Sequence, residues 1–231
     1  MINIITSFYV SKSIERQKEI NNSLTNNLIF SSVKNKHLFV DNKESSNYLL
    51  QHFSTNQNYI KIKTINLGRQ PFYSDLFEYA NLLENEICMI CNSDIWLSNI
   101  ENNILINILN NNLIYSLTRH ENDLSCPLIN DYRGSHDAFI FKSSLTNDII
   151  KHLKFYQNIW GSENVVLYEL KKYGYKILNP CKQIIIIHEH KSNIRNQNRK
   201  RINTGDYDGD NVFKIRSEFS KPCFINLNKY A

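Results

Sequence analysis

Residues 86–97, Glu-Ile-Cys-Met-Ile-Cys-Asn-Ser-Asp-Ile-Trp-Leu, carry an acid in a position where it could do chemistry. The apolar run from Ile87 to Cys91 predicts a buried strand that stops at Asn92-Ser93-Asp94. In open α/β sheets, ligands bind in the crevice beyond the carboxyl ends of the strands. Asp94 could therefore hold a metal ion or accept a proton there. Asn, Ser and Asp also favour turns, so this stretch alone leaves a site and a plain turn both open.

Two histidines far along the chain could complete a metal site with Asp94. His188 and His190 follow the apolar run from Ile184 to Ile187, and alternate positions of a strand share one face. Magnesium prefers oxygen ligands and manganese also accepts imidazole, so Mn²⁺ or Mg²⁺ would suit such a group. The alternative is a pair of histidines that are exposed or satisfied in the core.

Other expected strand ends are polar as well. Thr6-Ser7 ends the first apolar run, Asp41 follows the second, and Arg119 follows a run that begins at Leu113. A shared site explains several polar strand ends of one sheet more readily than a set of unrelated turns does.

Two charged segments near the end of the chain are further candidates for a site. Residues 206–210 resemble the start of an EF-hand loop, but Asn211 stands where that loop needs glycine, and a solvated turn is favoured. The basic run that precedes them is either a solvated face or a flap whose cations meet phosphates. Its members are Lys191, Arg195, Arg199, Lys200 and Arg201.

The chain alternates strand and helix patterns along its first half, which predicts a parallel, helix-covered sheet, and the later strands make that sheet mixed. We expect a single α/β domain over residues 1–190, with a basic, Gly- and Asp-containing arm over 191–231 that packs on or near the active site. Strands are expected at 2–8, 37–40, 59–65, 87–91, 113–118, 137–142, 175–178 and 184–187. Helices are expected from Ser11 or Ser13 to about Asn26, at 44–53, from Ser74, at 99–111 and from Ser162.

Composition limits the class of protein. The chain has 231 residues, 42% of them hydrophobic, so it is long enough for one sizeable core and is not disordered. A net charge of +5 suits an anionic ligand such as a nucleotide phosphate and is too weak to indicate nucleic acid by itself. No apolar stretch approaches the roughly 20 residues of a membrane span. The sequence does not indicate an oligomeric state.

The five cysteines show no disulfide or metal pattern. Cys88 and Cys91 form a C-x-x-C, but within a strand they point to opposite faces, whereas a zinc or redox pair needs both sulfurs on one side. An odd number without framework spacing favours a reducing compartment. The N-terminus lacks the basic region and cleavage site of a signal peptide, so we expect a cytoplasmic protein.

Seven stretches together resemble the GT-A-type nucleotide-sugar glycosyltransferases. The resemblance is nearest to small viral and bacterial members, including the chlorella-virus glycosyltransferases, and spans nearly the whole chain to about residue 195. The stretches are ITSFYV (5–10), GRQPFYSDLFEYAN (68–81), ICMICNSDIWL (87–97), LTRHE (117–121), GSHDAFIFK (134–142), ENVVLYELKKYGYKILNP (163–180) and HEHKSNIR (188–195).

The resemblance implies a role for particular residues. The family's Asp-x-Asp metal motif matches Asn92-Ser93-Asp94, so the metal would rest on Asp94, with His190 or His188 completing the site, while Asn92 and Ser93 contact the nucleotide or donor sugar. The same resemblance puts Thr6, Phe8, Tyr9 and Asp41 in the nucleobase pocket, Arg69 and Asp75 near the nucleotide or donor sugar, and Arg119 on donor or acceptor.

The implied reaction moves a sugar from a nucleoside diphosphate sugar, UDP-linked by expectation, to a glycan or other hydroxyl acceptor with inversion. Asp137 and Glu163 are the candidates for the carboxylate that removes the acceptor proton. Glu163 opens a helix, whose positive end should keep it ionised. Two alternatives remain: a non-catalytic nucleotide-sugar-binding protein of the same fold, which the Asn92 departure favours, and a nucleotidyltransferase, which the lack of glycine from Thr6 to Ser13 disfavours.

Overall fold

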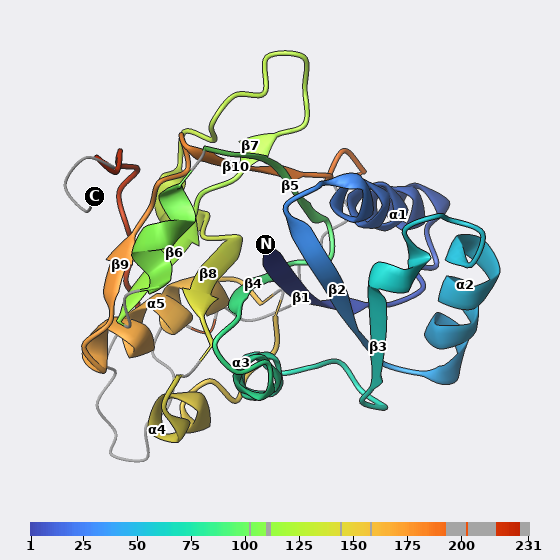
Figure 1. Cartoon of the computed structure of the whole chain (residues 1–231), viewed down its shortest axis with the longest axis horizontal. Coiled ribbons are helices and arrows are strands. Elements are labelled where there is room, and N and C mark those ends of the chain that lie inside the picture. Colours follow the sequence, from blue (N-terminus) through green and yellow to red (C-terminus); the bar gives the residue numbers. More distant parts are fainter. Residues whose placement is uncertain are drawn as a thin grey trace.

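A computed structural model describes residues 1–101, 103–109, 112–143, 145–157, 159–192, 202 and 216–226. Within them the chain forms a seven-stranded sheet in the order β3-β2-β1-β4-β8-β6-β9 and a three-stranded sheet in the order β5-β10-β7 (Figure 1). In the large sheet, β1 pairs in parallel with β2 and β4, and β2 with β3, whereas β8 runs antiparallel between β4 and β6. The predicted mixed, mainly parallel sheet is confirmed.

The strands of the large sheet are β1 (Ile2–Phe8), β2 (Val33–Val40), β3 (Ile62–Asn66), β4 (Ile87–Cys91), β6 (Leu113–Leu117), β8 (Ala138–Lys142) and β9 (Lys176–Leu178). The small sheet contains β5 (Ile95–Ile100), β7 (His120–Glu121) and β10 (Ile184–His188). The helices are α1 (Ile14–Ile29), α2 (Lys43–Phe53), α3 (Tyr73–Leu82), α4 (Asn147–Lys151) and α5 (Ser162–Lys172). Short 3₁₀ turns occupy Tyr59–Lys61, Ile104–Leu109 and Tyr132–Gly134.

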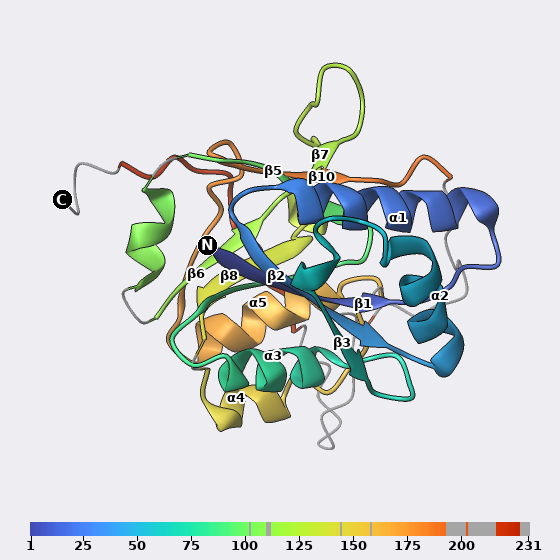
Figure 2. The same ribbon diagram turned by 45° about the vertical axis from the view of Figure 1, so that its right-hand side comes forward.

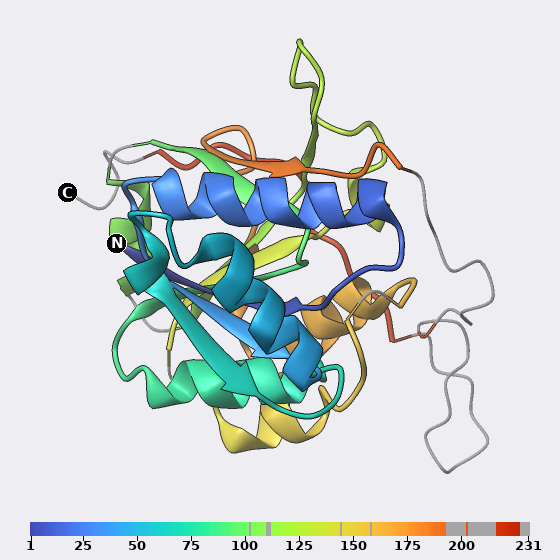
Figure 3. The same ribbon diagram turned by 90° about the vertical axis from the view of Figure 1, so that its right-hand side faces the viewer.

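Apolar side chains cover both faces of the large sheet. On one face, α3, α4 and α5 pack through residues such as Phe77, Ile149 and Val166. On the other face, β5 and β10 contribute Ile95 and Ile186, and α1 and α2 cover β2. Figures 2 and 3 show this layering, with α1 and the small sheet on one side and α3 and α4 on the other.

Alternation along β4 places its two cysteines in different layers. Cys88 belongs to the apolar cluster under α3 and α5, and Cys91 to the cluster under the small sheet. All five cysteines are free thiols. The expectation that Cys88 and Cys91 are buried and point to opposite faces of the strand is confirmed.

One predicted helix and one predicted helix cap were wrong. The helix over 99–111 is instead the end of β5 and a 3₁₀ turn over 104–109, because Ile95 and Leu97 alternate inward and β5 pairs with β10. Ser74 does not cap α3: the helix already begins at Tyr73, and the Asp75 carboxylate accepts the free backbone N–H of Phe72 at 2.6 Å. The short helix α4 was not predicted, and residues 59–61 form a turn ahead of β3.

The described helices include none with the length and apolar character needed to cross a bilayer. The acidic cluster at 206–210 and the basic residues Arg195, Arg199, Lys200 and Arg201 lie outside the described residues. Of the predicted arm, residues 216–226 pack beside α5 and β9, where the Glu218 N–H donates to the Asn164 carbonyl at 3.1 Å and the Cys223 N–H to the Asn179 carbonyl at 2.9 Å.

Candidate active site

A cavity of about 840 Å³ lies at the carboxyl ends of β1, β2 and β4. Because parallel strands of one sheet end at the same edge, residues that follow them converge there. The polar or charged residues that line it include Ser7, Asp41, Asn92, Asp94, Arg119, Asp137, Glu163, His188 and His190. Polar strand ends that are far apart in sequence therefore meet in one cavity.

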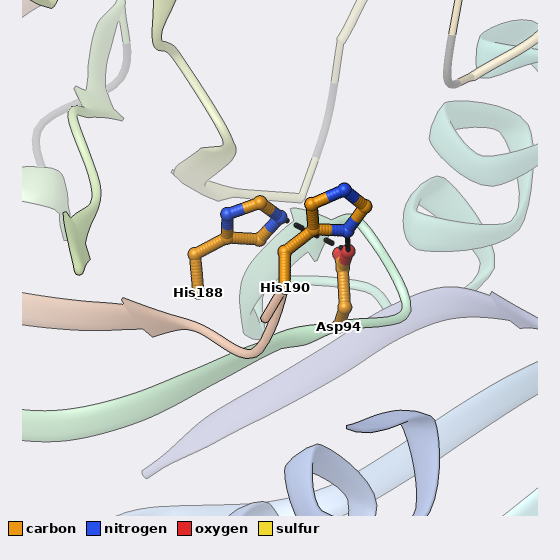
Figure 4. A group of neighbouring side chains, drawn as sticks. All are labelled: Asp94, His188 and His190. Carbon is orange, nitrogen blue, oxygen red and sulfur yellow. Dashed lines mark hydrogen bonds and ion pairs between the residues drawn. The ribbon is translucent and has the colours of Figure 1, made fainter. Parts of the chain in front are cut away.

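Asp94 and the two histidines meet because β5 begins directly after Asp94 and pairs antiparallel with β10. His188 stands opposite Ile95 in that ladder, and the Glu189 N–H donates to the Asp94 carbonyl at 2.8 Å. His188 Nε2 lies 3.0 Å and His190 Nδ1 3.7 Å from Asp94 Oδ2 (Figure 4). The imidazole rings stack with their centroids 5.0 Å apart, so the two histidines do share a face.

The group could hold a divalent cation. One ligand atom from each of Asp94, His188 and His190 lies within 4.8 Å of the others. Asp94 Oδ1 and His190 Nε2 are buried and have no hydrogen-bond partner among the described residues. Such orphaned atoms are costly unless a ligand satisfies them, and one carboxylate with two imidazoles suits Mn²⁺. The donor set therefore fits the expected metal.

A buried arginine, which the sequence analysis did not single out, also contacts Asp94. Arg16 Nη2 donates to Asp94 Oδ2 at 2.7 Å, and Arg16 Nη1 lies 2.9 Å from His190 Nδ1. Burial opposes ionisation of Asp94, but His188, His190 and Arg16 together hold the pKa of Asp94 well below its usual range. A signal was present: Arg16 continues the four-residue spacing of Ile20, Leu24 and Leu28, so a charge lies on the buried stripe of α1.

Glu163 and Asp137 form a second acidic group in the cavity. Glu163 lines the cavity. Partial burial of its carboxyl raises the pKa of Glu163 to about 7, and the nearby charge of Asp137 adds to this rise. The N-terminus of α5 was expected to keep Glu163 ionised, but the pKa of Glu163 is raised rather than lowered. Hydrogen bonds with its own N–H, Ser162 and Asn92 lower the pKa less than burial raises it.

Asp137 is held more firmly than Glu163. It directly precedes β8, its Oδ2 accepts a short bond from Ser135 Oγ, and its Oδ1 accepts from Arg119 Nη1 at 3.3 Å. Arg119, which was predicted to contact the donor sugar or the acceptor substrate, also forms an ion pair with Glu121 at 3.2 Å. It is therefore paired with two carboxylates. Both the guanidinium and the hydroxyl fix the position of the Asp137 carboxylate.

The expected nucleobase residues fall into two groups. Phe8, Tyr9 and Asp41 line the cavity, with Ser45 Oγ donating to Asp41 Oδ1 at 2.8 Å. Thr6 is not among the described residues that line it, because its hydroxyl turns into the sheet and donates to the Cys91 carbonyl at 2.7 Å. Ser93 is likewise buried outside the lining, and its hydroxyl has no hydrogen-bond partner in the described part of the chain.

Arg69 and Asp75 bind each other rather than facing the cavity. The guanidinium makes two bonds to the carboxylate, at 2.8 and 2.9 Å, and lies 4.4 Å from the centre of the Phe72 ring. Neither residue is among the described lining residues, although Gln70 between them is. The pair braces the loop before α3, and its place near the nucleotide or donor sugar stays a prediction.

Replacement of Asp75 by alanine should therefore affect stability more than donor binding. The variant loses the acceptor for the Phe72 N–H at the start of α3, and loss of such a cap costs about 1 kcal/mol. Urea unfolding should show this loss. The Kd for UDP with Mn²⁺ should change less than about threefold, which is well short of the tenfold change that corresponds to about 1.4 kcal/mol of binding free energy. A tenfold weaker Kd would place Asp75 in the donor site after all.

No protein-family model and no curated protein matches the sequence, but solved structures match the fold. Mannosyltransferase PcManGT from Pyrobaculum calidifontis, in complex with GDP-Man and Mn²⁺, aligns with a TM-score of 0.52 at 11% identity over 81% of this chain. S. aureus TarS 1–349 with UDP-GlcNAc gives 0.54 at 12% over 80%, and GalNAc-T7 with UDP, GalNAc and Mn²⁺ gives 0.50 at 11% over 81%.

The chain spans 56%, 57% and 43% of the length of these three structures. At such identities the likeness shows the fold alone, which is the predicted GT-A type. The resemblance to viral members stays a prediction.

Proposed function

We propose that the protein transfers a sugar from a nucleoside diphosphate sugar to a hydroxyl of a glycan acceptor, with inversion. The observation that carries this proposal is one cavity that holds both the Asp94–His188–His190 group and the carboxylate of Glu163. Neighbours of the same fold contain UDP, UDP-GlcNAc or GDP-Man, two of them with Mn²⁺, which supports the choice of donor and metal.

Asp94, with His188 and His190, would hold Mn²⁺ or Mg²⁺ at the end of β4. A bound divalent ion neutralises charge that develops on a departing diphosphate. Asn92 lines the same cavity, and its carbonyl oxygen Oδ1 is buried without a hydrogen-bond partner among the described residues. This oxygen can accept a hydrogen bond from a hydroxyl of ribose or of the donor sugar.

Glu163 would be the general base. The acceptor oxygen attacks the anomeric carbon, the bond from that carbon to the diphosphate oxygen breaks, and the acceptor proton passes to the Glu163 carboxylate. A pKa near 7 suits this role because a base works best when its pKa lies near the operating pH. Asp137, fixed by Ser135 and Arg119, would be a positioning residue whose charge helps to raise the pKa of Glu163.

Asp41 would select the base of the donor. Its carboxylate lines the cavity beside Phe8 and Tyr9 and can accept the imide N–H of uracil or an N–H of guanine. Cytosine and adenine present an acceptor nitrogen at the corresponding edge. We therefore propose a UDP-linked donor, with a GDP-linked donor as the competitor that the test must include.

A thermal-shift panel with a turnover assay tests the function. UDP, GDP, ADP and CDP, each with and without Mn²⁺, are compared first, and the corresponding UDP- and GDP-sugars are then assayed for transfer or slow hydrolysis. Stabilisation by UDP only with Mn²⁺, together with release of UDP from a UDP-sugar, is the expected result. Binding without any release would leave a nucleotide-sugar-binding protein, and release of pyrophosphate from a nucleoside triphosphate would indicate a nucleotidyltransferase.

Replacement of Asp137 by asparagine should shift the pH profile of the reaction. Glu163 must be ionised to act as base, so kcat/KM should fall about tenfold for each pH unit below a pKa of about 7. The Asn variant removes the neighbouring negative charge that raises this pKa, so the acid limb should move to lower pH. A pH–rate profile of both proteins measures the shift. An acid limb at unchanged pH would mean that another group is the base.

A further inference from the structure

The buried guanidinium of Arg16 contacts two of the three residues that could hold a metal. Arg16 Nη2 donates to Asp94 Oδ2, the oxygen that both histidines approach, and Arg16 Nη1 lies beside His190 Nδ1. A nitrogen or oxygen lone pair engaged by a guanidinium N–H is not free for a metal in that direction. Arg16 thus closes Asp94 Oδ2 and His190 Nδ1 to a divalent ion, which leaves Asp94 Oδ1 and His190 Nε2 open.

The charges around Arg16 show what its displacement would involve. Asp94 and Glu19 are its two carboxylate partners, with Glu19 Oε2 at 2.9 Å from Nη1. Glu19 is also held by the N–H and hydroxyl of Ser192, at 2.6 and 2.9 Å, so it keeps partners if Arg16 moves. A divalent ion at Asp94 would instead stand against the positive charge of Arg16. The resting contact and the metal-bound state are thus mutually unfavourable.

A diphosphate resolves this conflict. Arg16 lines the cavity, so it borders the space that a donor would fill. Guanidinium groups bind phosphate oxygens through paired, charge-assisted hydrogen bonds. The arrival of a nucleoside diphosphate would give Arg16 a new anionic partner at the moment when the metal takes Asp94.

We propose that Arg16 is a counter-cation that opposes metal binding at Asp94 and His190 while no nucleotide is bound and transfers to the diphosphate when metal and nucleotide bind together. The proposal rests on the proposed function for its second half, the diphosphate contact. Its first half concerns the metal alone. Arg16 thereby makes metal binding and donor binding depend on each other, a coupling that each ligand must report equally.

Replacement of Arg16 by methionine tests both halves with opposite signs. Mn²⁺ affinity without nucleotide, measured by the electron paramagnetic resonance signal of free Mn²⁺, should rise about tenfold, on the scale of one charged hydrogen bond. UDP affinity at saturating Mn²⁺, measured by calorimetry, should fall about tenfold, also on that scale. Uridine, which has no phosphate, should bind both proteins equally.

Lys18→Met is the matched control. It removes the same charge from the same helix at an exposed position, so both affinities should stay within about twofold, a difference too small to count as a lost charged hydrogen bond. Thermal unfolding shows whether Arg16→Met is folded. Arg16→Gln, which removes the charge and keeps a hydrogen-bond donor, should change both affinities in the same directions.

Unchanged or weaker Mn²⁺ binding in both Arg16 variants would overturn the competition, since Arg16 would then only position Asp94. Unchanged UDP affinity would overturn the transfer to the diphosphate. If the wild-type protein binds no nucleoside diphosphate at any Mn²⁺ concentration, the proposed function fails. The measurement with Mn²⁺ alone still decides whether Arg16 opposes metal binding.

Discussion

Replacement of Asp94 by asparagine is expected to reduce Mn²⁺-dependent sugar transfer by about a thousandfold, since a metal supplies several kcal/mol to such a reaction and each 1.36 kcal/mol is a factor of ten. Asp94 is the one carboxylate in the described Asp–His–His group, and both imidazoles point at its Oδ2. An amide at this position keeps the shape and loses the negative charge. Initial rates over a Mn²⁺ titration, with free Mn²⁺ binding measured in parallel, test this.

The stability of the Asp94 variant needs its own control because Arg16 would keep its charge without its partner. Breaking one side of a buried ion pair costs about 3–5 kcal/mol. The double variant Asp94→Asn, Arg16→Met removes both charges and should regain part of this loss without regaining Mn²⁺ binding. Asp148→Asn, in an exposed pair with Lys151, is the matched substitution that should change neither property. A folded Asp94→Asn protein with full Mn²⁺-dependent turnover would exclude the metal role.

The elements that build the cavity could largely be predicted from local patterns. The apolar runs of β1 and β4 are interrupted sharply by polar residues, and Ser13 caps α1 as expected, accepting the Arg16 N–H at 3.2 Å. These features depend on residues adjacent in sequence. The same holds for the shared face of His188 and His190, which follows from the two-residue period of a strand.

The contact between Asp94 and His188 was a hypothesis that residue types suggested and local patterns alone could not establish. It depends on the antiparallel pairing of β5 with β10, which joins residues about ninety positions apart, and β5 itself was partly mistaken for a helix. The available signal was the two-residue spacing of Ile95 and Leu97. Neither segment alone determines the register that sets His188 opposite Ile95.

The pairing of Arg69 with Asp75 and the raised pKa of Glu163 show a second limit. A charged residue close to a motif suggests a ligand contact until its partner is known, and Arg69 has its partner six residues away. For Glu163, the position at a helix start predicts a lowered pKa, whereas burial and the charge of Asp137 raise the pKa. Both outcomes depend on three-dimensional surroundings, which residue type and spacing do not contain.

Replacement of Glu163 by glutamine is expected to lower kcat by about 100- to 10,000-fold, the range for loss of a general base. The amide fits the same space and can still accept from Asn92, but it cannot take the acceptor proton. UDP and Mn²⁺ binding should stay within about threefold, well below the contribution of a charged hydrogen bond, because the proposed role of Glu163 is at the acceptor and not at the diphosphate. Single-turnover transfer at pH 8, where wild-type Glu163 is ionised, gives the comparison.

Stability separates this loss of activity from damage to the fold. Because the folded-state pKa of Glu163 is raised, the ionised side chain opposes folding, and that cost accumulates as pH rises from 4.5 to about 7 and is fully present at pH 8. Glutamine removes the charge, so the variant should unfold at a higher temperature than the wild type at pH 8, whereas Glu78→Gln at an exposed position on α3 should change neither stability nor rate. A stable Glu163→Gln protein with wild-type kcat, or a product that retains the donor's anomeric configuration by proton NMR, would contradict Glu163 as the base. The inverting reaction needs a carboxylate at the acceptor, and in the described cavity Glu163 combines an open face with a pKa near neutrality.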